Sequence, residues 1–420
     1  MSKNIKIQIF IIALLFTMVS GFLQVAPCVN SDFILPQVDI DENLFLKIVT
    51  LFFLSYAILQ IPCGFLLDSR GFRKILPISI FLVFIGTTIY SYSHNHLLIG
   101  FGRIITGAGC SSSYILTVFL ATKYFKKSII PLLIGLAEIT NAMGDFIANN
   151  IYLYTINSLG LNISHLITVS IIFFLFCYSL IIAMKTEKVE YTPTNNIKIS
   201  AKNALQSMLK ILRQPANIAV LSYSFFTWAI LMGFPGYWAK NYYIHMHNYS
   251  KEYAISIPEF FWISFLISTL AIGAYTKTIQ QAKKYIFALS VLGVGVYLLM
   301  VMPILFSYFF IIFITILSGL SCAGITLAFF IIQYNTEPKD KALAVSINNL
   351  FIVFGAMFGQ ILFSYAILYD FNKIYKLSSE IHPYFYSGIM MILLWTILVL
   401  ISVVFILQTS KKIRPIKGLI

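Results

Sequence analysis

Three charged side chains, Arg103, Glu138 and Asp145, interrupt long apolar stretches of the sequence. A charge is expensive to bury in an apolar segment, so its presence there indicates a functional site. Glu138 and Asp145 are seven residues apart and would share one face of a helix. We predict an ion pair between Arg103 and Asp145, which leaves Glu138 as the carboxyl group that binds and releases a proton. In the alternative, Arg103 only extends toward the membrane surface and both acids have structural roles.

The stretches that carry these charges have the length of membrane-spanning helices. The chain has 420 residues, of which 59% are hydrophobic and 10% are charged, whereas soluble domains carry about 25% charged residues. A bilayer core needs roughly 20 apolar residues per helix. We therefore predict an all-α membrane protein rather than a soluble enzyme. Its twelve transmembrane helices lie near 7–28, 43–67, 75–93, 98–121, 129–152, 165–184, 217–239, 255–275, 285–302, 307–331, 342–368 and 384–407.

The net charge of +14 reports the orientation of these helices and not a nucleic-acid site. If the N-terminus is cytoplasmic, 23 of the 29 Lys and Arg residues fall on the cytoplasmic side and Arg103 lies in the membrane. The outer segments hold only five, which are Lys47, Lys240, Lys251, Lys373 and Lys376. We predict that both termini are cytoplasmic and that no nucleic acid is a partner.

The cysteines and histidines show no spacing typical of metal ligands or of a catalytic group. The five cysteines lie in or at the ends of apolar stretches, as small core residues do. We therefore expect no metal, no cofactor and no enzymatic activity. All six histidines are predicted near the outer face, where they could sense an acidic exterior, although a chance distribution explains them more simply. They are His94, His96, His165, His245, His247 and His382.

The predicted helices divide into two groups of six. The longest polar stretch, 185–216, falls between the sixth and seventh helices and ends in a helical pattern, NALQSMLKILRQ. Near the end of the second predicted helix, Gly64 is followed by basic residues. A degenerate copy of this pattern begins at Gly273, near the end of the eighth predicted helix. We predict a bundle over 1–184, a cytoplasmic loop over 185–216, and a second bundle over 217–420 with a short basic tail. Two pseudo-symmetric bundles are the layout of a duplicated transporter.

A specific motif follows the second helix: Gly64, Asp68, Gly71, Arg73 and Lys74 are spaced as G-x-x-x-D-x-x-G-x-R-K. The glycines allow a tight turn and close helix packing, and the acid can pair with basic groups or with a helix N-terminus. This loop resembles the signature of the major facilitator superfamily. The resemblance implies that the motif gates the cytoplasmic side as the two bundles rock, in an alternating-access mechanism.

The fourth helix supports the same resemblance, because Arg103, Gly107 and Gly109 match the family pattern R-x-x-x-G-x-G. The resemblance implies a role for Arg103 in proton coupling or in binding an anionic group. It also implies a substrate cavity lined by the first, fourth, seventh and tenth helices and their neighbours. The polar and aromatic candidates there are Gln24, Tyr114, Tyr223, Trp228, Asn348 and Asn349.

The fifth helix bears on the direction of transport. Drug–proton antiporters of the family carry a glycine- and proline-rich pattern there, but this chain has Ala148 and Asn149 where that pattern requires glycine and proline. This favours uptake over the alternative, efflux of drugs or metabolites. The composition and short loops also resemble the phagosomal nutrient transporters of intracellular bacteria. We therefore expect a proton-coupled importer of a small nutrient such as an amino acid, a monomer in the lipid of a bacterial inner membrane, driven by the proton gradient without a cofactor.

Overall fold

The computed structural model describes residues 2–38, 40–187, 201–235, 239–301, 306–368, 396, 399–404 and 406–407. Within them the secondary structure is entirely helical, and eleven helices are long and apolar enough to cross a membrane. These eleven spans confirm the all-α membrane class and coincide with the first eleven predicted helices. The predicted twelfth helix, 384–407, lies mostly outside the described residues.

Contacts along the chain define two compact units, which are described separately. The first comprises 1–126, 136–208 and 337–347, and the second comprises 127–135, 209–336 and 348–420. The chain therefore changes unit within α10 (Ala201–Leu212), the helix that the NALQSMLKILRQ pattern predicted. The predicted boundaries 1–184, 185–216 and 217–420 stay a prediction.

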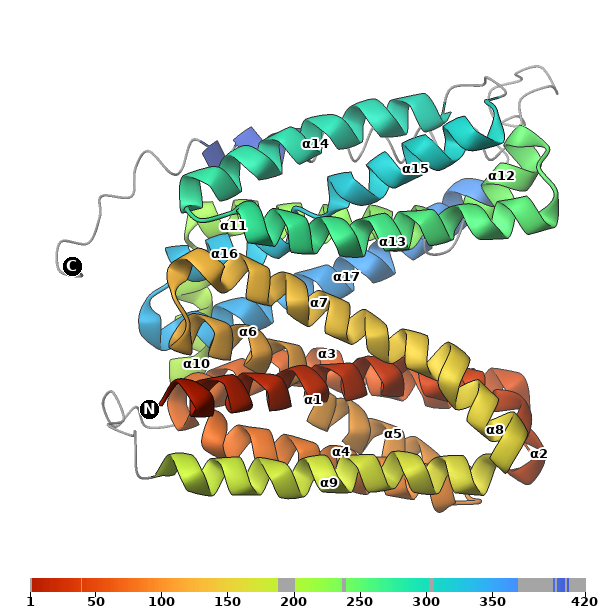
Figure 1. Ribbon diagram of the computed structural model, residues 1–420, viewed down its shortest axis with the longest axis vertical. Coiled ribbons are helices and arrows are strands. Elements are labelled where there is room, and N and C mark those ends of the chain that lie inside the picture. The colour runs from red at the N-terminus through yellow and green to blue at the C-terminus, as the bar shows by residue number, and fades with distance from the viewer. Residues whose placement is uncertain are drawn as a thin grey trace. The chain divides into compact units, whose positions relative to one another are not determined.

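In the first unit, α5 packs against both α3 and α4, and α4 packs against α9 (Figure 1). The helices of this unit, some of which extend beyond it, are α1 (Lys3–Val29), α2 (Ser31–Val38), α3 (Glu42–Arg70), α4 (Phe72–Tyr92), α5 (His96–Cys110), α6 (Ser113–Tyr124), α7 (Ile130–Phe146), the π-helix η2 (Ile147–Tyr152), α8 (Leu153–Leu159) and α9 (Leu161–Glu187).

In the second unit, α13 and α14 both pack against α15, and α11 packs against α16 (Figure 1). A short 3-10 turn of this unit, η1 (Lys127–Ile129), precedes α7. A second one, η4 (Pro338–Asp340), belongs to the first unit and precedes the last described long helix. The remaining helices are α11 (Pro215–Gly233), α12 (Ala239–His247), α13 (Lys251–Tyr275), α14 (Ile279–Val301), α15 (Tyr308–Cys322), α16 (Ile325–Asn335) and α17 (Lys341–Leu368).

Local sequence signals set several helix ends. The side chains of Asp41 and Asn95 accept backbone N–H hydrogen bonds in the first turns of α3 and α5, at 2.7 Å and 2.8 Å, as N-cap residues do. Gly71 ends α3 with φ +76°, a conformation that glycine adopts without steric strain. This confirms the tight turn that the glycine in the motif predicted.

The predicted fourth and tenth helices are each divided by a short break. α5 and α6 meet at Ser111 and Ser112, and α15 and α16 meet at Ala323 and Gly324. Two breaks in corresponding helices of the two halves agree with the pseudo-symmetric six-helix bundles expected from the sequence. The predicted fifth helix is also interrupted, because its chain passes through the π-helix η2.

Close helix contacts at small residues hold the first unit together. A Cβ atom added at Gly144 of α7 would collide with the backbone of Met18 and Phe22 of α1. Lipid tails are as apolar as the helices, so the hydrophobic effect does not drive helices together in a membrane. They associate through tight packing of this kind instead.

We therefore expect Gly144→Ala to destabilise the protein by about 1–3 kcal/mol, the usual cost of overpacking a tight contact. Thermal unfolding of the purified protein in detergent would show this as a lower Tm. Gly295→Ala is the matched control, because a Cβ atom there meets nothing within 4 Å. Equal Tm values for the two variants would contradict the assigned contact.

Candidate functional site

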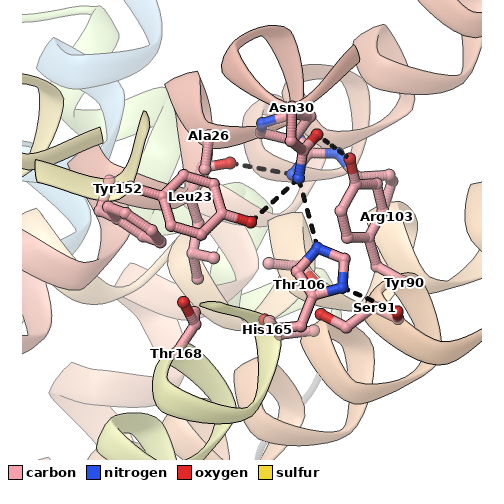
Figure 2. A pocket seen from close by; sticks show the side chains of 13 residues that line it. Leu23, Ala26, Asn30, Tyr90, Ser91, Arg103, Thr106, Tyr152, His165 and Thr168 are labelled. Atoms are coloured by element: carbon pink, nitrogen blue, oxygen red, sulfur yellow. Dashed lines mark hydrogen bonds between the residues drawn. The ribbon is translucent and has the colours of Figure 1, made fainter. Parts of the chain in front are cut away.

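A small cavity of about 20 Å³ lies in the first unit, where α1 and α4 end and α5 and α9 begin (Figure 2). An apolar cluster that includes Ile34, Phe45 and Ile48 packs beside it. The lining of the cavity combines apolar groups with hydroxyl, amide, imidazole and guanidinium groups. The lining residues are Phe22, Leu23, Ala26, Pro27, Asn30, Thr87, Tyr90, Ser91, Arg103, Thr106, Tyr152, His165 and Thr168.

Asn30 connects three helices at this cavity. Its amide group lies 2.9 Å from Tyr90 Oη and 3.0 Å from Tyr152 Oη, and these two contacts hold for either orientation of the amide. The more satisfied orientation also lets the amide nitrogen donate to the carbonyl oxygens of Pro27 and Ala26. Asn30 is fully buried, so these hydrogen bonds replace the water that it would otherwise bind.

His165 completes the network from α9. Its Nδ1 lies 2.8 Å from the carbonyl oxygen of Ser91, and its Nε2 lies 3.4 Å from the amide group of Asn30 (Figure 2). Because a carbonyl oxygen only accepts, Nδ1 must carry a proton. Thus His165, which the sequence placed among six histidines near the outer face, is a buried member of this network.

Arg103 is only 1% exposed and lines the same cavity. Its Nη1 donates to the carbonyl oxygen of Leu23 at 2.9 Å, and its Cζ lies 4.6 Å from the centre of the Phe52 ring and 5.8 Å from that of Tyr90. Small residues bring α5 this close: Gly102 contacts the backbone of α4, and Gly107 contacts that of Phe52. Cation–π contacts of this kind stabilise a desolvated guanidinium by about 2 kcal/mol.

The predicted ion pair between Arg103 and Asp145 is not formed in this structure. Among the described residues, Arg103 Nε and Nη2 and Asp145 Oδ1 are buried without a hydrogen-bond partner. The prediction rested on similar depth in the membrane, but depth does not fix the direction in which a side chain points. The Leu23 carbonyl and the Phe52 ring hold the guanidinium instead.

Glu138 pairs with a phenol side chain of the neighbouring helix. Tyr114 Oη donates to Glu138 Oε1 at 2.5 Å, which joins α6 to α7. Tyr114 is 7% exposed and Glu138 is half-buried. Two residues that the sequence singled out separately therefore form one contact. A phenol can donate to the ionised carboxylate and can still contact the protonated acid, so this pair can accommodate both states.

The motif from Gly64 to Lys74 begins in the last turns of α3, whereas Phe45 and Phe52, near the Arg103 cavity, lie in the first half of that helix. The two carboxylate oxygens of Asp68 accept hydrogen bonds from the backbone N–H groups of Ala342 and Leu343, at 3.0 Å and 2.9 Å. Asp68 therefore caps the N-terminus of α17, where a negative charge is favourable. Gly64 contacts Ser346 and Ala342 so closely that a Cβ atom would not fit. Arg73 is half-buried and Lys74 is exposed.

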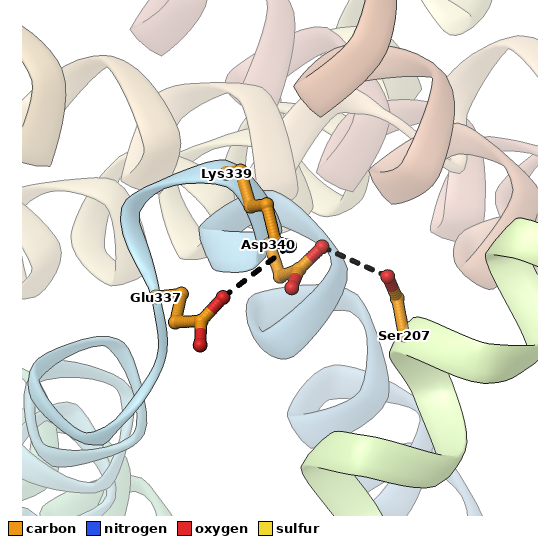
Figure 3. A network of polar contacts seen from close by, with 4 residues as sticks. All are labelled: Ser207, Glu337, Lys339 and Asp340. Carbon is orange, nitrogen blue, oxygen red and sulfur yellow. Dashed lines mark hydrogen bonds and ion pairs between the residues drawn. The ribbon is translucent and has the colours of Figure 1, made fainter. Parts of the chain in front are cut away.

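A second acid, Asp340, lies in the turn that leads into α17. It is 6% exposed, and the hydroxyl group of Ser207 on α10 donates to its Oδ1 at 3.0 Å (Figure 3). The neighbouring ion pair between Lys339 and Glu337, at 3.4 Å, is at the surface and contributes little to stability. The contact between Ser207 and Asp340 was not expected from the sequence.

The remaining predicted residues are dispersed. Gln24 of α1 is half-buried, Trp228 packs edge-on against Phe265, and Tyr223 is 1% exposed. Asn348 accepts a hydrogen bond from Ser224 at 2.8 Å, so this pair has an interhelical structural role. Asn349 is also buried.

The sequence analysis did not single out the cavity residues Asn30, Tyr90, Tyr152 and Thr87. Asn30 and Tyr90 lie at helix ends, where polar residues are common, and the contacts between them span long distances along the chain. The one available signal was that Asn30 lies just beyond the first apolar stretch, 7–28, in place of the charged residues usual at a membrane surface.

Comparisons with known proteins agree with this geometry. The family model of the major facilitator superfamily matches residues 8–360. No curated protein shows significant sequence similarity to the chain. Solved structures of low sequence identity share the fold. A bacterial homologue of the iron transporter ferroportin, in an outward-facing state, has a TM-score of 0.74 at 12% identity, with 97% of this chain and 100% of that chain covered.

Two further structures extend this likeness. The Escherichia coli fucose:proton symporter has a TM-score of 0.62 at 15% identity, with 94% of this chain and 99% of that chain covered. A human organic anion transporter has a TM-score of 0.64 at 11% identity, with 96% and 99% covered. At such identities the likeness shows the fold alone. Together with the family match over most of its length, the helical spans and the motif, it establishes that the chain belongs to the major facilitator superfamily.

Proposed function

We propose that the protein is a secondary active transporter that imports a small organic nutrient, such as an amino acid, together with protons by alternating access. The contact between Tyr114 and Glu138 carries the proposal. A carboxyl group deep in a membrane helix is costly to keep charged, so it favours a role in which it gains and loses a proton. Among the described residues, no basic side chain pairs with Glu138 to fix it in the ionised state.

Proton symport is compatible with this fold, since one of the structurally similar proteins is a fucose:proton symporter. The altered antiporter pattern at Ala148 and Asn149 supports uptake, and this region forms the π-helix η2. We further propose that the chain works as a monomer in a bacterial inner membrane, with both termini in the cytoplasm and no cofactor beyond the proton gradient. Efflux of drugs or metabolites is the alternative that transport measurements must exclude.

The contact of Asp68 supports a gating role for the motif. It fixes the first turn of α17 to the end of α3, and both of these segments belong to the first unit. We propose that this cap forms when the cytoplasmic side is closed and breaks when it opens.

Replacement of Glu138 by glutamine keeps the size of the side chain and a contact with Tyr114 but removes the titrating group. We expect Glu138→Gln to lose accumulation of solute driven by an inward proton gradient, while exchange of labelled for unlabelled solute continues. The assay uses proteoliposomes and a panel of labelled amino acids. Glu259→Gln, at an exposed position on α13, is the control. Gradient-driven accumulation by Glu138→Gln at the parental level would contradict the proton role.

Loss of a helix cap costs about 1 kcal/mol. In Asp68→Ala we therefore expect the backbone amides of Ala342 and Leu343 to exchange hydrogen several-fold faster, with slower transport. Hydrogen-exchange mass spectrometry of the full chain measures this. Asp41→Ala removes the cap of α3 instead and should accelerate exchange only near Leu44. Unchanged exchange at the start of α17 in Asp68→Ala would show that the cap does not hold that turn.

A further inference from the structure

His165 of α9 has a polar partner at each of its two ring nitrogens. Nδ1 lies 2.8 Å from the carbonyl oxygen of Ser91, which is near the end of α4. Nε2 lies 3.4 Å from the amide group of Asn30, the residue that ends α1 (Figure 2). His165 is 3% exposed and Asn30 is fully buried, so bulk water does not replace either contact. The protonation of the ring therefore depends on which atoms these partners present to it.

The orientation of the Asn30 amide decides what Nε2 of His165 faces. One end of the amide lies 3.0 Å from the carbonyl oxygen of Pro27 and 3.3 Å from that of Ala26. Carbonyl oxygens only accept, so the amide nitrogen is at this end. The amide oxygen is then at the other end, where it accepts from the Tyr152 hydroxyl group at 3.0 Å and faces His165. Both ring nitrogens of His165 therefore face oxygen atoms.

Only the doubly protonated form of histidine can donate from both ring nitrogens. A neutral ring that is protonated at Nδ1 would keep its contact with Ser91, but it would turn the lone pair of Nε2 toward the Asn30 amide oxygen. The amide cannot relieve this repulsion by turning over, because its oxygen would then face the carbonyl oxygens of Pro27 and Ala26. The hydrogen bonds of this network are therefore complete only when Nε2 carries a proton.

The surroundings of His165 contain nothing else that holds such a proton. Within the described residues no carboxylate lines the cavity beside the ring, and Arg103 of α5, which also lines it, carries a charge of the same sign. Three phenols are nearby: the ring centres of Tyr90 and Tyr92 on α4 lie 6.3 Å and 6.4 Å from that of the imidazole, and Tyr152 of η2 shares the cavity. The two acceptor oxygens thus retain the proton, and a movement that separates α9 from the end of α1 would release it.

We infer that His165 is a proton-binding site, in which the imidazolium donates from Nδ1 to the Ser91 carbonyl oxygen and from Nε2 to the Asn30 amide oxygen. The bound proton joins α9 to the ends of α1 and α4, and its loss frees α9 from α1. That this proton is one of those that cross with the solute rests on the proposed function. The binding of the proton does not, since it follows from the contacts of these three residues.

The test is nitrogen-15 NMR of the full-length protein, labelled at its histidine side chains and reconstituted into liposomes. The imidazolium form and the two neutral tautomers give different pairs of ring nitrogen shifts. His165→Gln assigns the signals of His165 by their loss. Between about pH 5 and pH 8, the range in which histidine charges change, we expect His165 to pass from the imidazolium to the neutral form protonated at Nδ1. A ring that is neutral throughout this range would overturn the inference.

Two substitutions of Asn30 test the assigned contact. Asn30→Asp places a carboxylate opposite Nε2, so the imidazolium signals of His165 should persist to a pH at least about one unit higher, because a nearby opposite charge favours the cation. Asn30→Leu removes the acceptor and should confine these signals to a lower pH than in the parent. The exposed His94 is the internal control, and its signals should be alike in all three proteins. An identical titration of His165 in the parent and in both variants would overturn the site.

Proton binding and transport can fail separately. If His165 titrates as described but the entry of solute is not linked to protons, the site stands and the proposed function fails. If proton-driven uptake occurs while His165 stays neutral, the proposed function stands and this site does not.

Discussion

The burial of charge without water is the constraint on which this structure depends. In an apolar bundle, each buried polar group must find a partner within the protein or at a wet cavity. Arg103 meets this requirement only in part, through the Leu23 carbonyl oxygen and the Phe52 and Tyr90 rings. The glycines of α5 allow the close helix contacts that put it there. An apolar bundle would be more stable without this arginine, so its presence indicates a function that uses the charge.

Two carboxyl groups of the first unit, those of Asp68 and Glu138, are stabilised in different ways. Asp68 accepts two backbone N–H groups at the start of α17, an arrangement that favours the ionised form. Glu138 accepts one hydrogen bond from a neutral phenol, that of Tyr114, which stabilises the ionised carboxylate less than two backbone N–H groups do. This difference separates a carboxylate that backbone N–H groups hold at the Gly64 to Lys74 motif from a carboxyl group whose phenol partner can accommodate either protonation state. It matches the division of roles expected of a transporter that rocks between two states.

Much of this architecture could be predicted from the sequence, because apolar stretches of membrane length, basic loops and the Gly64 to Lys74 motif are local signals. The turn at Gly71 follows from the same signals. The partners of buried polar groups could not be predicted in the same way. The contact between Asn30 and Tyr90 and the direction of Arg103 depend on how helices distant in sequence are rotated against each other. For that reason the predicted pair of Arg103 and Asp145 is not formed in this structure, while the association of Tyr114 with Glu138 emerged only in the structure.

The central claim is that solute and protons cross together through one protein. The most direct test is the internal pH of proteoliposomes that contain the purified protein and a trapped pH-sensitive dye, without an imposed gradient. When a transported amino acid is added outside, the account predicts that the lumen acidifies as the solute enters. Entry of the solute without a change of internal pH, or with a rise in internal pH, would contradict it.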